Sequence, residues 1–169
     1  MDDKALMRLA LRQAAMDDQE VPVGAVIALD GRVVASAHNE QVALNCALAH
    51  AEVLAIQRAQ AAMGQARLKG CTLYVTLEPC PMCAGAIIMA GLARCVFAAF
   101  DSQYGCCGSL YALPMDPAFH HRVPCEGGLM EEEASALLRA FFASRREKAD
   151  DTALWQAKLY HPHLPLAND

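Results

Sequence analysis

The stretch Pro79-Cys80-Pro81-Met82-Cys83 constrains this chain most, because it sets two thiols at the start of one helix. Proline fixes its own backbone angle and has no amide hydrogen to satisfy, so Pro81 suits the first helical position. Cys80 is then predicted to be the N-cap residue and Cys83 the third residue of the first turn. Unpaired amides and the positive end of the helix dipole lower the pKa of thiols there, which favours the thiolate that binds metal. We therefore predict that Cys80 and Cys83 are metal ligands.

A third ligand and a proton carrier are predicted earlier in the chain, at His50-Ala51-Glu52. His50 supplies an imidazole, and a set of two cysteines and one histidine leaves one position of a tetrahedral zinc ion open for water. An open position is typical of catalytic zinc sites. If Glu52 lies in the first turn of a helix, its carboxylate can face that water. The alternative interpretations are a packed core that only looks like a metal site and, for Glu52, a solvated helix acid.

Composition is that of a one-domain protein. The 169 residues are 55% hydrophobic, enough to bury a continuous core without disulfides. The chain has eight cysteines but opens acidic and shows no signal peptide, so we expect a reducing, cytoplasmic location. Charged or turn residues interrupt every apolar run, so no membrane span is expected. The net charge of −5 counts against nucleic-acid binding, although residues 41–100 carry four basic and two acidic side chains and leave room for a local basic face.

Hydrophobic periodicity and turn residues predict an α/β domain. Asp30-Gly31 is a strong signal for a type I′ hairpin turn, and Gly24 suggests either close approach of a ligand or a bulge or sheet edge. A three-layer α/β/α arrangement follows, with a mixed sheet and helices on both faces, so that His50 and Cys80 lie at the same end of the sheet. The predicted helices are residues 2–16, 50–63, 81–91 and 131 to about 148; the predicted strands are residues 21–29, 32–37, 71–77, 95–100 and a short edge strand at 122–125.

The joint occurrence of His-x-Glu and Pro-Cys-x-x-Cys is the signature of zinc-dependent nucleobase deaminases. The flanking segments resemble the bacterial tRNA-specific adenosine deaminases, which make inosine at the wobble position of tRNA. The resemblance implies a cytidine-deaminase-like fold with a central five-stranded sheet over residues 1–148. Residues 149–169 lie outside it, and their prolines and weak periodicity indicate a tail that is helical in part, over residues 152–159. The segments that carry the likeness are residues 21–26, Asn39, 50–52, 73–86, 105–109, 121–123 and 141–146.

This resemblance also implies partners and roles. It implies one Zn²⁺ per subunit, a tRNA anticodon stem-loop as substrate, and a homodimer that shares the RNA groove, with residues 84–89 as a contact. Glu52 carries protons during attack on the adenine ring, and Asn39 holds the flipped nucleoside. The remaining substrate contacts that the resemblance implies are Val23, Leu77, Asp101, His121, Phe142, Arg145 and Arg146. For Arg145 and Arg146, the alternative explanation is that they simply cap the end of the helix.

The chain departs from the family pattern at four places. Residues 45–49 replace the Asp-Pro-Thr-Ala that commonly precedes His-Ala-Glu, and Gln103 and His120 stand where lysine and asparagine are frequent. Cys106-Cys107 replaces two alanines. A cysteine is small enough to pack in place of an alanine, so we interpret the pair as core residues, with a metal or redox role as the alternative.

Three other functions remain open on the sequence. A deaminase of free guanine or cytosine compounds would use the same zinc site. A catalytically silent zinc and RNA-binding subunit would need no proton carrier, which Glu52 argues against. A redox protein that works through Cys80 and Cys83 would leave His50 without a role.

Overall fold

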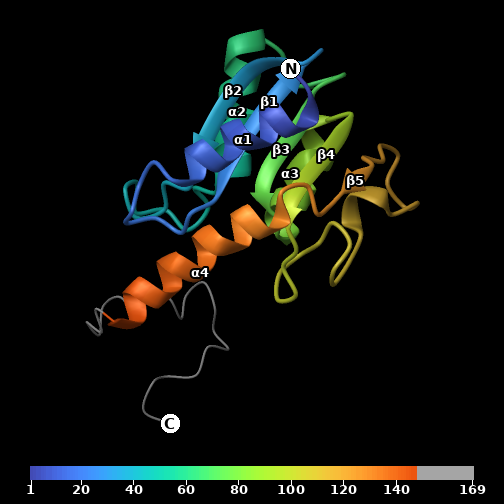
Figure 1. Ribbon diagram of the computed structural model, residues 1–169. Coiled ribbons are helices and arrows are strands. Elements are labelled where there is room, and N and C mark those ends of the chain that lie inside the picture. The colour runs from blue at the N-terminus through green and yellow to red at the C-terminus, as the bar shows by residue number, and fades with distance from the viewer. Residues whose placement is uncertain (148–169) are drawn as a thin grey trace.

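The computed structural model describes residues 1–147, in which helices and strands follow the predicted order (Figure 1). The predicted tail at residues 149–169 lies outside the described residues. In chain order the elements are α1 (Asp3–Ala14), β1 (Gly24–Leu29), β2 (Arg32–His38), α2 (Ala51–Met63), β3 (Thr72–Leu77), α3 (Pro81–Ala90), β4 (Arg94–Ala99), the 3₁₀ helix η1 (Leu113–Met115), β5 (Cys125–Glu126) and α4 (Glu131–Glu147).

The sheet has five strands in the order β2-β1-β3-β4-β5, which confirms the predicted mixed sheet. β1 pairs antiparallel with β2 and β3, whereas β3, β4 and β5 pair parallel. Because β2 and β3 are both antiparallel to β1, they point the same way and end at the same edge. α2 follows β2 and α3 follows β3, so both helices begin beside that carboxyl edge, where ligand sites of α/β sheets usually lie.

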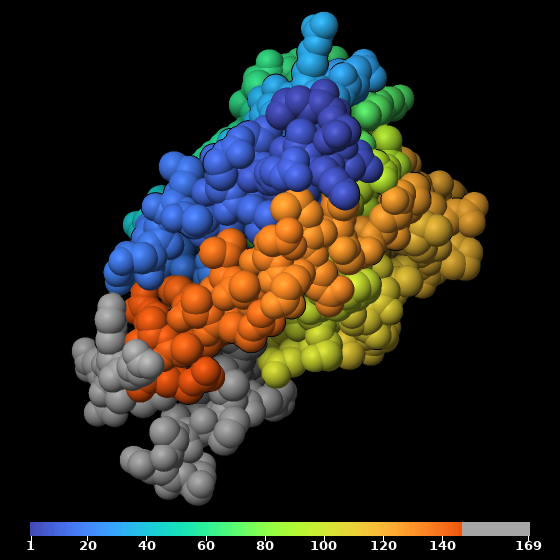
Figure 2. Space-filling view, in the orientation of Figure 1, coloured from blue at the N-terminus to red at the C-terminus, as the bar shows by residue number. Residues whose placement is uncertain are grey.

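Helices cover both faces of the sheet, as predicted (Figure 1). Side chains alternate between the faces along β1, as the period of a strand requires. Ala25 and Ile27 pack in the core on the side of α2 and α3, and Val26 and Ala28 pack in the core on the side of α1 and α4. Figure 2 shows α1 in blue and α4 in orange, lying across one face of the molecule. Both faces are buried, which explains why β1, an interior strand, is apolar along its whole length.

The Asp30-Gly31 turn joins β1 to β2 as the sequence predicts. Asp30 has φ of 49° and Gly31 has φ of 72°, and a type I′ turn requires positive φ at both central residues. Aspartate and glycine are the residues that tolerate these angles at low cost. The hairpin is therefore specified by two adjacent residues.

Gly24 makes room for α1, and neither interpretation made from the sequence accounts for it. A Cβ atom at this position would overlap the carbonyl oxygen of Ala10 and the amide nitrogen of Ala14. β1 is an interior strand, and its register shifts at Ile27/Ala28 rather than at Gly24. The glycine is required because the helix backbone packs directly on the strand.

Some element boundaries differ from the predictions. α1 ends at Ala14, so Met16 lies beyond the helix and is 64% exposed. The edge strand β5 is confirmed, but it covers Cys125–Glu126 rather than residues 122–125. Pro124 explains the shift, because its carbonyl oxygen accepts a hydrogen bond from Cys95 N at 2.9 Å, whereas its own nitrogen has no hydrogen to donate to the ladder.

Candidate metal and substrate site

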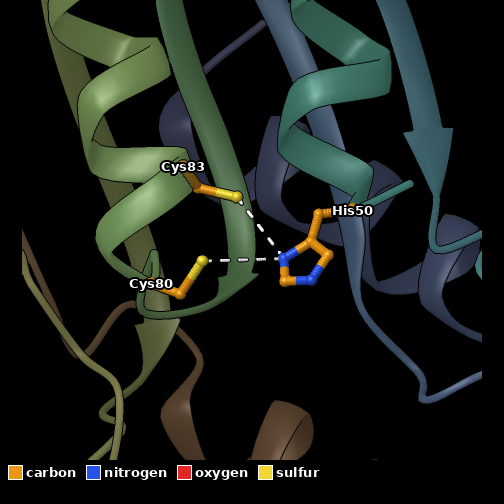
Figure 3. Close-up of side chains that lie close together, drawn as sticks. All are labelled: His50, Cys80 and Cys83. Atoms are coloured by element: carbon orange, nitrogen blue, oxygen red, sulfur yellow. Dashed lines mark hydrogen bonds between the residues drawn. The ribbon is translucent and has the colours of Figure 1, made fainter. Parts of the chain in front are cut away.

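Three predicted ligands meet where α2 and α3 begin. His50 is the N-cap residue of α2 and Cys80 that of α3, with Pro81 in the first helical position, as predicted. The Nδ1 atom of His50 lies 3.7 Å from Sγ of Cys80 and 3.5 Å from Sγ of Cys83. Figure 3 shows both sulfur atoms directed from α3 toward the imidazole ring. Bond lengths of about 2.3 Å to sulfur and about 2.0 Å to nitrogen place such ligand atoms about 3.6 Å apart around a tetrahedral zinc ion. The spacing therefore suits zinc.

The two thiols differ in protonation, which corrects the prediction that the pKa of both is lowered. The pKa of Cys80 falls to about 4, because its sulfur accepts a hydrogen bond from the Cys83 thiol and, more weakly, interacts with His50. The pKa of Cys83 rises well above its usual value, because its thiol donates that hydrogen bond and is buried. Burial would lower the pKa of His50, but contact with Cys80 and the charge of Glu52 raise it. The pair retains a proton that a bound metal ion would displace.

Glu52 lies in the first turn of α2, as predicted, and its carboxyl is buried beside the ligands. It is 4% exposed, and its Oε2 atom has no hydrogen-bond partner among the described residues. Burial raises the pKa of Glu52, although the nearby charge of His50 opposes the rise. A buried carboxyl oxygen without a partner is unfavourable unless a ligand supplies a hydrogen bond. This unpaired oxygen, next to two sulfurs and an imidazole, fits a metal site that holds a water molecule.

A cavity of about 500 Å³ opens above these residues. That volume falls within the usual range for small-molecule sites. His50, Glu52 and Cys80 line it, and the predicted contacts Val23, Asn39, Leu77 and Asp101 lie in its wall. The other lining residues were not predicted from the sequence, and two of them, Ala47 and Leu48, fall in the segment that departs from the family pattern. Those other residues are Val21, Gln41, Ala47, Leu48, Glu78, Pro81, Met82 and Tyr104.

Asn39 holds the cavity wall through both ends of its amide. Its Oδ1 atom accepts a hydrogen bond from Ala51 N at 2.9 Å, and its Nδ2 atom donates to the Val21 carbonyl at 3.2 Å. The Ala51 amide is the first of α2 and has no partner inside the helix. An amide nitrogen carries two hydrogens, so the Val21 contact leaves Asn39 a second donor for a ligand.

Glu78 fastens the loop of residues 101–109 beside the cavity, a role that the sequence analysis missed. Its side chain is 1% exposed and accepts hydrogen bonds from the amides of Asp101 at 3.0 Å, Cys107 at 3.1 Å and Ser109 at 2.9 Å. The Ser109 hydroxyl donates to it as well. Any side chain at Gly105 would overlap the carboxylate, so the glycine lets the loop close around it. The sequence does carry a signal for this role: Glu78 stands at the end of a buried strand and is followed by a glycine-rich loop.

Four predicted substrate contacts do not line the cavity: His121, Phe142, Arg145 and Arg146. The His121 ring hydrogen-bonds to the Leu92 carbonyl at 2.7 Å, near the far end of α3. The other three lie on α4. Arg145 donates to the carbonyls of Asp18 and Gln19, each at 3.1 Å, and lies over the Phe141 ring. Arg145 therefore fastens α4 to the loop after α1, and the RNA contacts stay predictions.

Comparisons with known proteins agree with this geometry. The family model of the MafB19-like deaminases matches residues 1–123. The tRNA-specific adenosine deaminase of Bacillus subtilis is 44% identical over 148 residues, which are 86% of this chain and 92% of that protein. A solved structure from studies of A-to-I editing by tRNA:A34 deaminases is 44% identical, with a TM-score of 0.75 over 79% of this chain and 99% of its own. A guanine deaminase from Nitrosomonas europaea is 26% identical, with a TM-score of 0.73 over 84% of this chain and 85% of its own.

None of the helices within residues 1–147 combines the length and the apolar character that crossing a bilayer requires.

We expect Cys80→Ser, Cys83→Ser and His50→Ala each to lower the zinc content of the purified protein by about one ion per chain, because each change removes a ligand. Elemental analysis measures this content. Cys46→Ser is the matched control, since Cys46 is an exposed cysteine outside the cluster. Full zinc retention in all three variants would disprove the ligand assignment.

We expect Glu78→Gln to destabilise the protein by about 2 kcal/mol, because one carboxylate oxygen becomes an N–H group that faces buried donors. Denaturant titration measures the loss, and hydrogen exchange should speed up at the amides of Asp101, Cys107 and Ser109. Glu126→Gln is the control, since it makes the same chemical change at an exposed ion pair with Arg94. Unchanged exchange at the three amides would show that Glu78 does not hold the loop.

Proposed function

The chain belongs to the tRNA-specific adenosine deaminase family, and we propose that it hydrolyses adenosine to inosine at the wobble position of tRNA. The Bacillus subtilis relative supports this activity, because the match covers 92% of its length. The observation that carries the proposal is the buried, unpartnered oxygen of Glu52 at the floor of the cavity, beside His50, Cys80 and Cys83. A hydrolytic deaminase needs an acid-base group at that place.

His50, Cys80 and Cys83 would hold one Zn²⁺ per chain. When bound, zinc supplies a Lewis acid that makes water acidic enough to lose a proton near neutral pH. The chemistry of the donors supports zinc, since two sulfurs and one imidazole match the ligand sets of nucleobase deaminases and leave a position for water. The neighbouring Oε2 atom of Glu52 can hydrogen-bond to a water molecule in that position.

Glu52 moves the protons in this reaction. It takes a proton from the water as the water oxygen adds to C6 of adenine, and it delivers that proton to N1. It then takes the second proton from the new hydroxyl group at C6 and delivers it to the amino group, so that the bond from carbon to nitrogen breaks, ammonia leaves and the C6 carbonyl of inosine forms. Burial raises the pKa of Glu52, which brings the carboxyl closer to the working pH and suits a group that must both accept and donate.

The cavity accommodates one nucleoside rather than a helical stem. Its volume of about 500 Å³ suits a single purine nucleoside, so the adenine must leave the base stack to enter. Val23 and Leu77 offer apolar contact, and the second amide hydrogen of Asn39 is available to a polar group of the base or sugar. An anticodon loop presents bases that can be turned outward at low cost, which supports an anticodon stem-loop as substrate.

We further propose that residues 1–148 carry this activity and that two copies of the chain share the RNA surface. In the predicted contact segment of residues 84–89, Ala84, Ile87 and Ile88 are buried in the core of this chain, and Met89, which is 72% exposed, is the apolar side chain available to a second copy. The net charge of −5 requires that phosphates be held by a few placed cations. Arg146 is exposed on the last turn of α4 and suits this role, whereas Arg145 is engaged with Asp18 and Gln19.

We expect the protein to form inosine in an anticodon stem-loop and to release no ammonia from free guanine or cytosine compounds. Glu52→Gln should retain zinc and lose turnover by at least about 10²-fold, because the change removes the proton carrier without removing a ligand. Nucleoside analysis and elemental analysis measure the two effects, with Glu126→Gln as control. Ammonia from free bases alone would point to a free-base deaminase, and near-normal turnover of the Glu52 variant would place the proton carrier elsewhere.

We expect Arg146→Ala to weaken binding of the stem-loop and to reduce the slope of log affinity against log salt by about 1, because one phosphate contact is lost. Binding titrations across a salt series measure the slope. Arg32→Ala is the control, since Arg32 begins β2 at the end of the sheet opposite the cavity. A slope equal to that of the unmodified protein would show that Arg146 makes no phosphate contact.

A further inference from the structure

A second group of metal-ligating side chains lies apart from the catalytic cavity. Cys95 is on β4, Cys107 is in the 101–109 loop and Cys125 is on β5, and their sulfur atoms all lie within 4.8 Å of one another. Among the described residues, this group and His50-Cys80-Cys83 are the two that bring three cysteine, histidine or carboxylate ligand atoms so close. None of these three cysteines lines the cavity.

The backbone holds each of the three cysteines in place. Cys95 and Cys125 are direct partners in the parallel pairing of β4 with β5, so their side chains share one face. The amide of Cys107 donates to Glu78, and Cys107 also pairs with Ala112 in an isolated bridge. Segments that are distant in sequence thus present three sulfurs to one point without rearrangement of the chain.

Packing alone explains Cys106 but leaves the arrangement around Cys107 without a reason. Both are buried, and the sequence analysis treated both as substitutes for alanine. Cys106 belongs to neither of the two metal-ligating groups, whereas Cys107 is directed at two further thiols. Cys95 and Cys107 are nearly inaccessible, while the half-buried Cys125 leaves a route for a small ion. The neighbouring cysteines therefore differ in their surroundings although they are adjacent in sequence.

We propose that Cys95, Cys107 and Cys125 bind a second metal ion, of the thiophilic class to which Zn²⁺ and Cu⁺ belong. Three sulfurs around zinc lie about 3.8 Å apart, which the observed spacing accommodates with small side-chain adjustments. Soft sulfur ligands select such ions over magnesium and calcium. A bound cation would displace the thiol protons.

The second ion would fasten the 101–109 loop to the β4–β5 edge of the sheet. The same loop contributes Asp101 and Tyr104 to the cavity wall and is held from its inner side by Glu78. An ion on Cys107 therefore adds a second anchor to a segment that shapes the cavity. The site is structural, and it does not depend on the deaminase activity.

A cadmium titration of the reduced full-length chain tests the proposal, with Cys46→Ser as the background that removes the exposed thiol. We expect two Cd²⁺ ions per chain, each with thiolate-to-metal charge-transfer absorption. Cys107→Ala and Cys125→Ser should each bind one ion, whereas the matched variant Cys106→Ala should bind two. Cys80→Ser should also lose one ion, which separates a failure of the catalytic site from a failure of the second site. Zinc and cuprous ions added separately then identify which ion binds more tightly.

A second measurement uses Cys80→Ser as background, in which the catalytic site is disabled. Cd²⁺ should raise the thermal midpoint of this variant by several degrees and leave that of Cys80→Ser/Cys107→Ala unchanged, since a ligand stabilises only the state that binds it. A single Cd²⁺ ion in the Cys46→Ser background that is retained in Cys107→Ala and Cys125→Ser but lost in Cys80→Ser would overturn the proposal. Two ions retained in both Cys107→Ala and Cys125→Ser would overturn it equally.

Discussion

The catalytic site depends on two helices that begin side by side at one edge of the sheet. His50 and Cys80 occupy the N-cap positions of α2 and α3, yet neither side chain caps its own helix. The side chain of an N-cap residue usually accepts a hydrogen bond from one of the first backbone amides of the helix. Here Asn39 supplies an acceptor to Ala51, the first residue of α2, so the imidazole is free to face the sulfurs. The position of the ligands therefore requires a third residue that does the capping in place of His50.

The site brings together more groups that can carry negative charge than groups that can carry positive charge. Glu52, Cys80 and Cys83 lie close together, and only His50 offers positive charge among them. Burial raises the pKa of Glu52, and the hydrogen bond to Cys80 together with burial raises the pKa of Cys83, so the protonated forms of both groups are favoured. His50, Cys80 and Cys83 would hold a divalent ion, which would stabilise the thiolates and leave the Glu52 carboxyl to act on water. The protonation pattern is therefore that of a site built around a cation.

Local signals allowed prediction of the features that are encoded within a few residues. Pro81 predicted the start of α3, and Asp30-Gly31 predicted the hairpin, because each depends on the backbone preferences of those residues alone. The function of Gly24 depends on how α1 packs across it, and that of Glu78 on a loop more than twenty residues away. Neither relation leaves a periodic or spacing signal in a single sequence. The grouping of three cysteines was likewise invisible, because it requires the register of β4 against β5.

Buried acids hold both loops that flank the cavity. The residues proposed to carry out the reaction lie at the starts of helices, whereas these loops line the space for the substrate. Glu78 binds the amides of the 101–109 loop, and Glu20, which is 3% exposed, accepts hydrogen bonds from Val42 N at 2.7 Å and Ala43 N at 3.0 Å. Each acid fixes backbone amides, so the side chains on the two loops can vary without loosening the wall. The departure at residues 45–49 lies on one of these loops and places Leu48 against the cavity. The proposed metal ligands and Glu52 lie at the starts of α2 and α3, and the loop meets them through its backbone, since His50 N donates to the Leu48 carbonyl at 2.8 Å. Substrate preference can therefore diverge on this scaffold while the hydrolytic chemistry stays the same.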